Sequence, residues 1–467
     1  MELSGRKVLV VGLARTGIAT ARFLLKQGAL VAATDCKPSP GSEEDVKGLK
    51  EKGCTLRLGE HRIEDFLQAD LIVISPGVPL DLPALDQAIR AGKTVIGEVE
   101  MASLFLPSPV VAVTGSNGKT TTVSLIQAML EGAGIRHWVG GNIGRPLIEL
   151  LSEWSGKNET KPRVTVAEIS SFQLETIRTF RPWIAAWTNL SEDHLDRYPN
   201  MEAYGEAKFR IFMNQTAHDY AIVPSRDPWL ESRRGSLAAR LLRFGTPGEE
   251  LPEICLEGRR ILWRGPGHER GESYETDRIR LPGRHNLENM MVALAVARLC
   301  GAPPRAVQRV MDTFQGLEHR LEFVEEIRGV QFYNDSKGTT VDSVIRALEF
   351  FASPVLLLGG GKDKGGRFVP LRDSLRNHVR KLFLFGDAAG RMERELEGAV
   401  EIERVRDLDQ AVSRAWENAR PGEVVLLSPG CSSFDMFRDY EDRGSQFKTR
   451  VRSIAQRTGE LEGQKAR

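Results

Sequence analysis

A glycine-rich segment with a lysine and neighbouring hydroxyl residues is the part of the sequence best suited to chemistry. Val111–Thr122 reads V-A-V-T-G-S-N-G-K-T-T-T, an apolar run followed by a turn and the start of a helix. Gly115 and Gly118 would let the backbone approach phosphate oxygens, and amide groups that open a helix point toward such an anion. Lys119 would neutralise phosphate charge, and the Thr120 hydroxyl would hold a Mg²⁺ ion that bridges the phosphates. The segment therefore predicts an ATP site.

The spacing of this segment departs from the usual phosphate loop. Val113 stands where G-x-x-x-x-G-K-[ST] has its first glycine, so the segment is a shortened T-G-x-x-G-K-T variant. The predicted cradle also includes Ser116, Asn117 and Thr121. An ordinary turn between a strand and a helix is the alternative, and the register of glycines, lysine and hydroxyls disfavours it.

Two later segments carry residues of the types that hold metal ions. Val164–Ala167 predicts a strand that delivers Glu168, and Trp183–Thr188 predicts a strand whose following loop contains His194. Loops after parallel strands meet at one edge of a sheet, so these residues would face the magnesium nucleotide with one oxygen and one imidazole ligand. Taken alone, each residue is more often a hydrogen-bonded scaffold group than a ligand.

Lys208 and a pair of asparagines have no decisive pattern. Lys208 lies on a predicted helix, where lysines usually only solvate a face. Asn286 and Asn289 lie at the start of an apolar helix that runs through Leu299. Asn286 could be the N-cap of that helix, or the two amides could face a nucleotide from one helical turn. The three-residue spacing of the asparagines is compatible with both roles.

The last third of the chain places three loops after predicted strands. These loops contain residues 335–339, 359–366 and 428–435. Lys364, the Ser432 and Ser433 hydroxyls and nearby amides could bind a carboxylate, and Arg320 could reach a phosphate. Glycine runs that only make tight turns are the alternative, which three such loops in one region disfavour.

The beginning of the chain predicts a nucleotide-binding β-turn-α-β unit. Strands are expected over Lys7–Val11 and Leu30–Asp35, with a helix between them that ends at Lys26. Ala14 occupies the middle glycine position of G-x-G-x-x-G, which weakens the fingerprint. Asp35 could accept hydrogen bonds from a ribose or base, or could be a solvated acid at a strand end.

Length and composition indicate an ordinary globular protein of several domains. The chain has 467 residues, 41% hydrophobic and 27% charged. We expect an α/β fold of three domains, at residues 1–106, 107–316 and 317–467, each a mainly parallel sheet with flanking helices. The first and last would be Rossmann-like and the central one similar to phosphate-loop ATPases. Exposed loops are expected at Ser152–Pro162 and Gly245–Gly258, and a frayed end at Thr458–Arg467.

Charge and cysteine content argue against several classes. Lysine plus arginine number 64 and aspartate plus glutamate 63, so no global field would attract nucleic acid or a membrane. The five cysteines include no C-x-x-C pair, which argues against a disulfide framework or zinc site. The start of the chain lacks the apolar core of a signal peptide, and no apolar run approaches bilayer length. We therefore expect a cytoplasmic protein without stable membrane insertion.

Taken together, the motifs resemble the Mur ligases across all three expected domains. They are T-G-S-N-G-K-T, E-I-S-S-F-Q-L-E, N-L-S-E-D-H-L-D-R-Y, G-R-H-N-L-E-N, H-R, N-D-S-K-G-T, G-G-x-D-K-G and S-P-G-C-S-S-F-D. The E-x-S-S-F-Q-L-E segment and the S-P-x-x-x-S-x-D loop resemble the D-glutamate-adding members more than the others. A D-N-P-R motif, expected in the diaminopimelate- or lysine-adding members, is absent from the sequence.

The resemblance implies roles for individual residues. Thr120 and Glu168 would hold one Mg²⁺ ion, while His194 and Lys208, the latter as a carbamate, would hold a second, with Mn²⁺ as an alternative metal. Lys119, Glu168, His194 and Lys208 would form the catalytic set. The remaining contacts would be Asn286, Asn289, Arg320 and Asp335 to ATP; Thr16, Asp35, Gly77 and Asn142 to the UDP substrate; and Lys337, Thr339, Lys364, Ser433 and Phe434 to D-glutamate. Arg15 and Tyr440 depart from the family pattern, which affects details of substrate binding.

The activity implied is an ATP-dependent ligation that joins D-glutamate to UDP-N-acetylmuramoyl-L-alanine. The substrate carboxylate would attack the γ-phosphate to form an acyl phosphate, and the amine of D-glutamate would displace phosphate to give an amide. This reaction belongs to peptidoglycan precursor synthesis, and so to cell shape and division, and we expect a monomer. Alternatives are a Mur ligase for another amino acid, a nicotinamide-dependent oxidoreductase and a non-catalytic ATP-binding scaffold.

Overall fold

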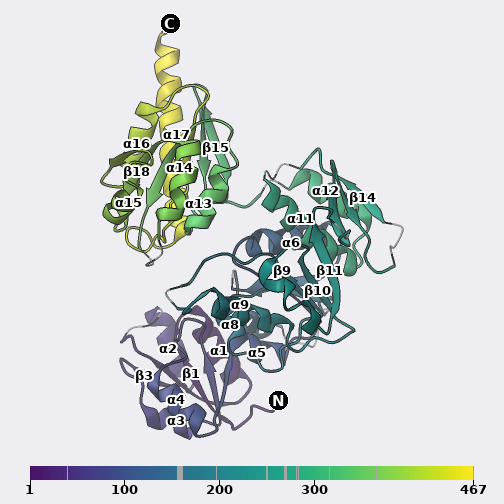
Figure 1. Cartoon of the computed structure of the whole chain (residues 1–467). Helices are drawn as coiled ribbons and strands as arrows, with labels where there is room; N and C mark the ends of the chain where they lie inside the picture. The colour runs from purple at the N-terminus through teal and green to yellow at the C-terminus, as the bar shows by residue number, and fades with distance from the viewer. Residues whose placement is uncertain are drawn as a thin grey trace. The chain divides into compact units, whose positions relative to one another are not determined.

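The computed structural model describes the chain except for residues 39, 41, 143, 155–160, 196, 249–250, 268–270, 280, 282, 315, 364, 366 and 466–467, and except for the side chains of residues 153 and 459–465. The described residues form three separate sheets with helices on their faces (Figure 1). They divide into two compact units. Met1–Leu190, Glu202–Ile279 and Leu287–Thr313 make the first unit, and Ser191–Met201, Arg280–Asn286 and Phe314–Arg467 make the second. The predicted α/β class with three mainly parallel sheets is confirmed, whereas the domain boundaries after residues 106 and 316 stay predictions.

The first sheet is five-stranded and parallel, in the order β3-β2-β1-β4-β5. Its strands are β1 (Lys7–Val11), β2 (Leu30–Asp35), β3 (Thr55–Leu58), β4 (Leu71–Ile74) and β5 (Thr94–Gly97), and its helices are α1 (Arg15–Lys26), α2 (Glu43–Glu51), α3 (Ile63–Gln68), α4 (Pro83–Arg90) and α5 (Glu98–Ser103). Helices α1, α2 and α5 cover one face, and α3 and α4 cover the other. Because both faces are covered, the inner strands β1, β2 and β4 are mainly apolar, whereas the edge strand β3 is more polar and more exposed. The predicted bounds of β1, β2 and the end of α1 are confirmed.

The central sheet has nine strands in the order β14-β13-β12-β11-β10-β9-β6-β8-β7, parallel from β7 to β12 and antiparallel beyond. Its strands are β6 (Val110–Thr114), β7 (His137–Gly141), β8 (Val164–Glu168), β9 (Ile184–Trp187), β10 (Tyr220–Pro224), β11 (Arg240–Gly245), β12 (Ile254–Glu257), β13 (Arg260–Trp263) and β14 (Glu272–Glu275). The predicted loop at Gly245–Gly258 is wrong over Ile254–Glu257, because this segment pairs with β11 and β13 and its first two residues are buried.

The helices of the central region are α6 (Lys119–Gly132), α7 (Leu147–Glu153), α8 (Ser171–Leu174), α9 (Met201–Phe209), α10 (Pro228–Glu231), α11 (Arg284–Leu299) and α12 (Pro304–Thr313), with 3₁₀ turns at Arg210–Phe212 and Arg234–Ser236. Helix α11 begins at Arg284, two residues before Asn286. The N-cap alternative for Asn286 is therefore wrong, since this residue already lies in the first turn. The predicted end of the helix at Leu299 is confirmed.

Two buried carboxylates on α5 join the first sheet to elements of the central region. Glu98 Oε1 accepts a hydrogen bond from the Ile148 amide at 2.7 Å, at the start of α7. Glu100 accepts the amides of residues 178–180 at 2.8–2.9 Å, together with the Thr179 hydroxyl. Burial raises the pKa of Glu98 to about 7. Hydrophobic side chains of both sheets also share one continuous core in this unit.

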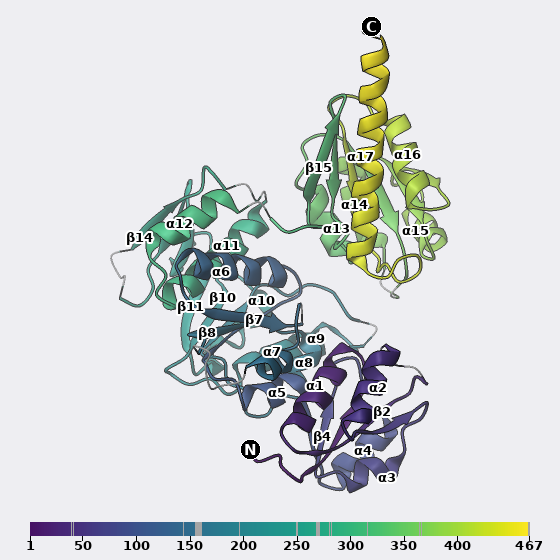
Figure 2. The same ribbon diagram turned by 180° about the vertical axis from the view of Figure 1, so that it is seen from behind.

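The third sheet has the order β15-β16-β20-β17-β18-β19 and is parallel except for β15. Its strands are β15 (Glu322–Ile327), β16 (Val330–Asn334), β17 (Val355–Gly360), β18 (Val379–Phe385), β19 (Glu401–Arg404) and β20 (Val424–Leu427), and its helices are α13 (Val341–Leu348), α14 (Arg372–His378), α15 (Ala389–Leu396), α16 (Leu408–Asn418) and α17 (Tyr440–Lys465), with a 3₁₀ turn at Val369–Leu371. Helices α13 to α15 pack on one face, and α16 and α17 pack on the other (Figure 2). The predicted bounds of β16 and β20 are confirmed.

The end of the chain is more ordered than its composition indicates. Helix α17 continues to Lys465, so the predicted frayed end at Thr458–Arg467 is wrong for the part that the structure describes. Phe447, Val451 and Ile454 anchor the helix by packing into the core of the third sheet. No described helix combines the length and apolar character that a membrane crossing requires.

Candidate active site

The turn between β6 and α6 is the predicted phosphate loop, and two of its glycines have positive φ. Gly115 and Gly118 have φ values of +145° and +83°, a region that favours glycine. A Cβ at Gly115 would overlap the Thr188 hydroxyl, and a Cβ at Gly118 would overlap Asn289 Oδ1. Both positions therefore favour glycine because of close neighbours as well as backbone conformation, whereas their approach to phosphate oxygens stays a prediction.

Lys119 and Thr120 open α6 directly behind this turn. The Lys119 ammonium donates to the carbonyl oxygens of Gly115 and Ser116, each at 2.8 Å. Thr120 is buried in the first turn of the helix. Helix N-termini attract anions because their first amides lack intrahelical partners. The loop therefore combines a cation, a hydroxyl and a helix N-terminus within six residues.

Two residues at the end of β9 hold the phosphate loop in place. The Asn117 amide donates to Asn189 Oδ1 at 2.9 Å, and Asn189 Nδ2 donates back to the Asn117 carbonyl at 3.0 Å. The Thr188 hydroxyl donates to the same carbonyl at 2.6 Å. Sequence reasoning missed Thr188 and Asn189 as positioning residues. The available signal was their location at the end of a strand predicted to neighbour the loop.

Glu168 presents a buried carboxylate at the same edge of the sheet. It lies opposite Val113 in the pairing of β8 with β6, and only 1% of its surface is exposed. Glu168 Oε1 accepts from Asn142 Nδ2 at 3.0 Å, whereas no described residue hydrogen-bonds to Oε2. Buried carboxylate oxygens usually have partners. A hard cation is a suitable partner for this oxygen, so the residues present fit the expected Mg²⁺ ion.

Lys208 lies against the phosphate loop. Its side chain is 1% exposed, and its ammonium donates to the Gly115 carbonyl at 2.8 Å. The same ammonium lies 4.5 Å from the centroid of the Tyr204 ring. The expectation that Lys208 merely solvates a helix face is therefore wrong, because tertiary contacts bury it.

A metal site in this region would need ligands of mixed type. Among the described residues, no cluster of three or more histidine, cysteine, aspartate or glutamate side chains is arranged to hold a metal ion. Thr120 and Glu168 supply a hydroxyl and a carboxylate, and a carbamate on Lys208 would add further oxygens. These are the ligand types that Mg²⁺ prefers.

In the first sheet, Asp35 organises the turn that follows β1. Its Oδ2 accepts from the Leu13 amide at 2.7 Å and its Oδ1 accepts from the Lys37 amide at 2.9 Å. The side chain is buried, so the alternative of a solvated acid is wrong. Thr16 lies in the first turn of α1, and Gly77 lies in the turn after β4. Since β1 pairs with both β2 and β4, the loops after these strands border the switch point where such sheets bind ligands.

In the second unit, the loop after β16 surrounds a buried carboxyl group. Asp335 Oδ2 accepts from the Ser428 hydroxyl at 2.7 Å, and burial raises the pKa of Asp335 to about 7. The charge of Arg320 acts against this rise. Partial burial lowers the pKa of His285 to about 4, and the charges of Arg346 and Arg320 contribute to this lowering. Arg320 therefore lies near both Asp335 and His285, the residue before Asn286.

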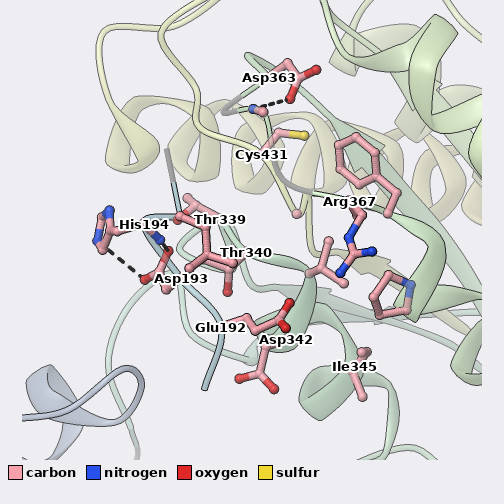
Figure 3. A pocket seen from close by; sticks show the side chains of 16 residues that line it. Glu192, Asp193, His194, Thr339, Thr340, Asp342, Ile345, Asp363, Arg367 and Cys431 are labelled. Atoms are coloured by element: carbon pink, nitrogen blue, oxygen red, sulfur yellow. Dashed lines mark hydrogen bonds and ion pairs between the residues drawn. The ribbon is translucent and has the colours of Figure 1, made fainter. Parts of the chain in front are cut away.

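A cavity of about 480 Å³ lies in the second unit (Figure 3). Its lining includes His194 and Thr339, which were predicted to serve the metal and D-glutamate respectively. His194 has a φ of +55°, and its amide donates to Asp193 Oδ1 at 3.0 Å. Ser433 and Phe434 are not among the described lining residues, and Phe434 is 67% exposed. Lys337 lies 4.9 Å from the Tyr440 ring centroid, whereas Lys364 lies outside the described residues.

The family models match each of the three regions. They are a Mur ligase MurD-like N-terminal domain at residues 6–97, a Mur ligase middle domain at residues 113–297, and a Mur ligase glutamate ligase domain at residues 319–431. The chain belongs to the Mur ligase family. The resemblance seen in the motifs is thereby confirmed.

Relatives and solved structures agree with this Mur ligase assignment. A UDP-N-acetylmuramoylalanine--D-glutamate ligase from Geotalea daltonii is 45% identical over 97% of this chain and 99% of its own length. A protein of the same name from Pelobacter propionicus is 48% identical over 97% of this chain and its own full length. The crystal structure of a UDP-N-acetylmuramate-alanine ligase from Thermotoga maritima covers 96% of this chain and all of its own, at 18% identity and a TM-score of 0.58. This last similarity concerns the fold.

The structure divides the predicted Mur ligase residues between its two units. The first unit brings the phosphate loop together with Glu168, Lys208 and Asn289, and adds Asn142 through its bond to Glu168. His194, Asn286, Arg320, Asp335 and the described D-glutamate candidates belong to the second unit. The roles of all these residues stay predictions.

Proposed function

We propose that this Mur ligase joins D-glutamate to UDP-N-acetylmuramoyl-L-alanine with conversion of ATP to ADP and phosphate. The observation that carries this proposal is the 45–48% identity, over 97% of the chain, to proteins named UDP-N-acetylmuramoylalanine--D-glutamate ligase. The phosphate loop, with Lys119 and the buried Glu168 beside it, supplies the groups that such phosphoryl transfer requires. The reaction would serve peptidoglycan precursor synthesis, in the cytoplasm, by a monomer built from domains at residues 1–106, 107–316 and 317–467.

The first step activates a carboxylate, which is a poor electrophile. The carboxylate of the muramoyl substrate attacks the γ-phosphorus of ATP, ADP leaves, and an acyl phosphate forms. Lys119 stabilises the negative charge that develops on the phosphate oxygens. Mg²⁺, held by Thr120 and Glu168, would supply charge neutralisation and orientation of the phosphates. A crystal structure of a MurF ligase from Thermotoga maritima, similar in fold at a TM-score of 0.58, contains ADP.

The second step forms the amide. The amine of D-glutamate attacks the acyl carbon, a proton is lost from nitrogen, and the tetrahedral intermediate collapses with departure of inorganic phosphate. Lys337, Thr339, Lys364, Ser433 and Phe434 would bind the incoming amino acid. Asn286, Asn289, Arg320 and Asp335 would bind ATP, and Thr16, Asp35, Gly77 and Asn142 would bind the UDP substrate. His194 and carbamylated Lys208 would hold a second Mg²⁺ ion.

The test is phosphate release from ATP by the purified protein with Mg²⁺ and UDP-N-acetylmuramoyl-L-alanine. D-glutamate, L-glutamate, lysine and diaminopimelate are added separately, and the product mass is measured. We expect release that requires both substrates and prefers D-glutamate. Preference for another amino acid would refute the specificity, and no release under any condition would refute the ligase activity. A Lys119→Ala variant should abolish release and serves as the control for contaminating ATPases.

A further inference from the structure

The side chain of Arg443, in the first turn of α17, is completely buried in the second unit. Its exposed fraction is 0%, and burial lowers the pKa of its guanidinium to about 10. Among the described residues, no carboxylate forms an ion pair with Arg443. A buried cation without a paired anion is rare because desolvation is costly. The hydrogen bonds that Arg443 donates to neutral groups must therefore compensate for the hydration that its guanidinium loses.

The guanidinium is held by two loops that leave the carboxyl edge of the sheet. Nη2 donates to the Ser336 carbonyl at 2.8 Å, and Nε donates to the Ser336 hydroxyl at 3.0 Å. On the other side, Nη1 and Nη2 donate to the Cys431 carbonyl at 3.2 Å, and Nη1 also donates to the Ser432 carbonyl at 3.3 Å. One planar group thus fixes the loop after β16 and the loop after β20 to the same point.

A third loop is tied to the same place. The Lys362 amide, after β17, donates to the Ser432 carbonyl at 2.9 Å. A Cβ at Gly361 would lie 3.1 Å from Arg443 Nη1, so glycine at this position leaves room for the guanidinium. The Gly430 amide also donates to the Gly338 carbonyl at 2.8 Å. The three loops after β16, β17 and β20 therefore form one hydrogen-bonded assembly with Arg443 beneath it.

The residues that Arg443 holds are neighbours of the proposed amino-acid contacts. Ser336 directly precedes Lys337 and lies three residues before Thr339, and Ser432 directly precedes Ser433. We propose that Arg443 is a positioning residue that sets the geometry of the amino-acid site through the backbones of Ser336 and Ser432, without contacting substrate. This inference rests on the proposed function, which assigns the amino acid to these loops.

The chemistry of the guanidinium explains why another cation would not substitute. Arginine presents five donors in a rigid planar fork, and here that fork spans acceptors on two loops. A lysine ammonium is a single point with three donors and cannot reproduce the fork. Methionine would preserve volume but leave the carbonyls of Ser336, Cys431 and Ser432 without these donors.

Arg380 provides a matched control in the same sheet. It lies near the start of β18, at the opposite edge from the three loops, and donates to both Glu423 carboxylate oxygens at 2.7 and 2.9 Å and to the Asn418 carbonyl at 2.7 Å. It is therefore also an arginine that ties together separate segments of the third sheet. Its loss should affect stability without affecting the amino-acid site.

The experiment compares Arg443→Lys, Arg443→Met, Arg380→Lys and Arg380→Met with the wild-type chain in steady-state kinetics. We expect both Arg443 variants to raise the KM for D-glutamate about tenfold or more, because small displacements of binding groups are costly. The KM values for ATP and the UDP substrate should change less than threefold, and the Arg380 variants should leave all three unchanged. Equal changes in all three KM values, or the same pattern in the Arg380 variants, would overturn the proposal.

Amide hydrogen exchange gives a readout that does not depend on activity. Peptides that cover residues 335–340 and 428–434 should lose protection in Arg443→Lys but not in Arg380→Lys. Unchanged protection would overturn the proposal even if activity falls. If wild-type protein showed no amino-acid-dependent phosphate release, the proposed function would fail, while the exchange comparison would still test whether Arg443 holds the loops. Arg443→Lys retains a cation and is the variant to use if Arg443→Met does not fold.

Discussion

The ammonium groups of Lys119 and Lys208 donate to the same acceptor, the carbonyl oxygen of Gly115, each at 2.8 Å. Two like charges that share one acceptor repel each other, and Lys208 is also removed from water. Addition of CO₂ to the Lys208 amine would replace this repulsion by an attraction between a carbamate and the Lys119 ammonium. The geometry therefore favours the modification that the family resemblance implies.

We predict that Lys208 carries a carbamate in protein equilibrated with bicarbonate. With ¹³C-labelled bicarbonate, a carbamate carbonyl signal should appear in the NMR spectrum of the wild-type chain and be absent from Lys208→Arg. Lys47→Arg, a substitution of a largely exposed lysine on α2 that forms a surface ion pair with Glu51, should leave the signal intact. A signal that survives in Lys208→Arg would assign the modification elsewhere.

Asn142 is predicted to act on metal binding through Glu168. Its amide nitrogen donates to Glu168 Oε1 at 3.0 Å, which orients Oε2 in a buried position. Loss of a residue that orients a metal ligand commonly weakens metal affinity about 10- to 100-fold. Asn142→Ala should therefore raise the Mg²⁺ concentration needed for half-maximal phosphate release by about tenfold. If only the KM for the UDP substrate rises, Asn142 acts as a direct substrate contact instead.

The conformation of Gly118 should be essential for ATP binding. Its φ is +83°, and a Cβ would overlap Asn289 Oδ1. A non-glycine residue in this region costs on the order of 1–3 kcal/mol, and the overlap with Asn289 adds displacement of the loop. Gly118→Ala should therefore lower the melting temperature and raise the KM for ATP at least tenfold.

A substitution at Gly134, just after the other end of α6, separates the cost of a positive φ from the effect of the contact with Asn289. Its φ is +67°, but a Cβ there meets nothing within 4 Å. Gly134→Ala should lower the melting temperature with little change in the KM for ATP. A similar rise in the KM in both variants would show that general destabilisation, rather than the Asn289 contact, is responsible.

Local patterns predicted much of the fold. The bounds of β1, β2, β16 and β20 followed from short, mainly apolar segments closed by glycine, aspartate or serine. Most residues of β1, β2 and β20 are buried, as parallel strands covered on both faces require, whereas β16 alternates buried and half-buried residues. The segment Ile254–Glu257 was missed because it is short and lies between glycine and glutamate residues. Its strand conformation depends on pairing with β11 and β13, which local composition does not encode.

The sequence predicted which residues could take part in the site, but it did not predict their burial or their hydrogen-bond partners. Lys208 is buried by Tyr204 and by a carbonyl that lies 93 positions away in the chain, so no local pattern could reveal its role. Asp35 was considered as a solvated acid, yet the turn after β1 folds back to donate the Leu13 amide to it. No local pattern distinguishes Arg443 from other arginines of a polar helix, and its burial becomes visible only where the loops converge.

The stability of the first unit should depend on the ionisation of Glu98. Burial raises its pKa from an ordinary value of 4.5 to about 7, so the folded state binds the proton more tightly than the unfolded state. The stabilisation from this proton is fully present below about pH 4.5 and is lost as the pH rises through about 7. The difference between the pKa values of Glu98 in the folded and unfolded states corresponds to about 3 kcal/mol of unfolding free energy, at about 1.36 kcal/mol for each pKa unit.

Glu98→Gln should remove this dependence, because a neutral amide keeps an oxygen for the Ile148 amide and does not ionise. Differential scanning calorimetry from pH 5 to pH 8 should show similar melting temperatures for the variant and the wild type at pH 5, and a higher one for the variant at pH 8. Glu100→Gln is the contrasting variant, since both Glu100 oxygens accept backbone amides and an amide nitrogen cannot accept them. It should lower the melting temperature at pH 8. A Glu98→Gln variant that melts below the wild type at pH 8 would show that ionised Glu98 stabilises the junction between α5 and α7.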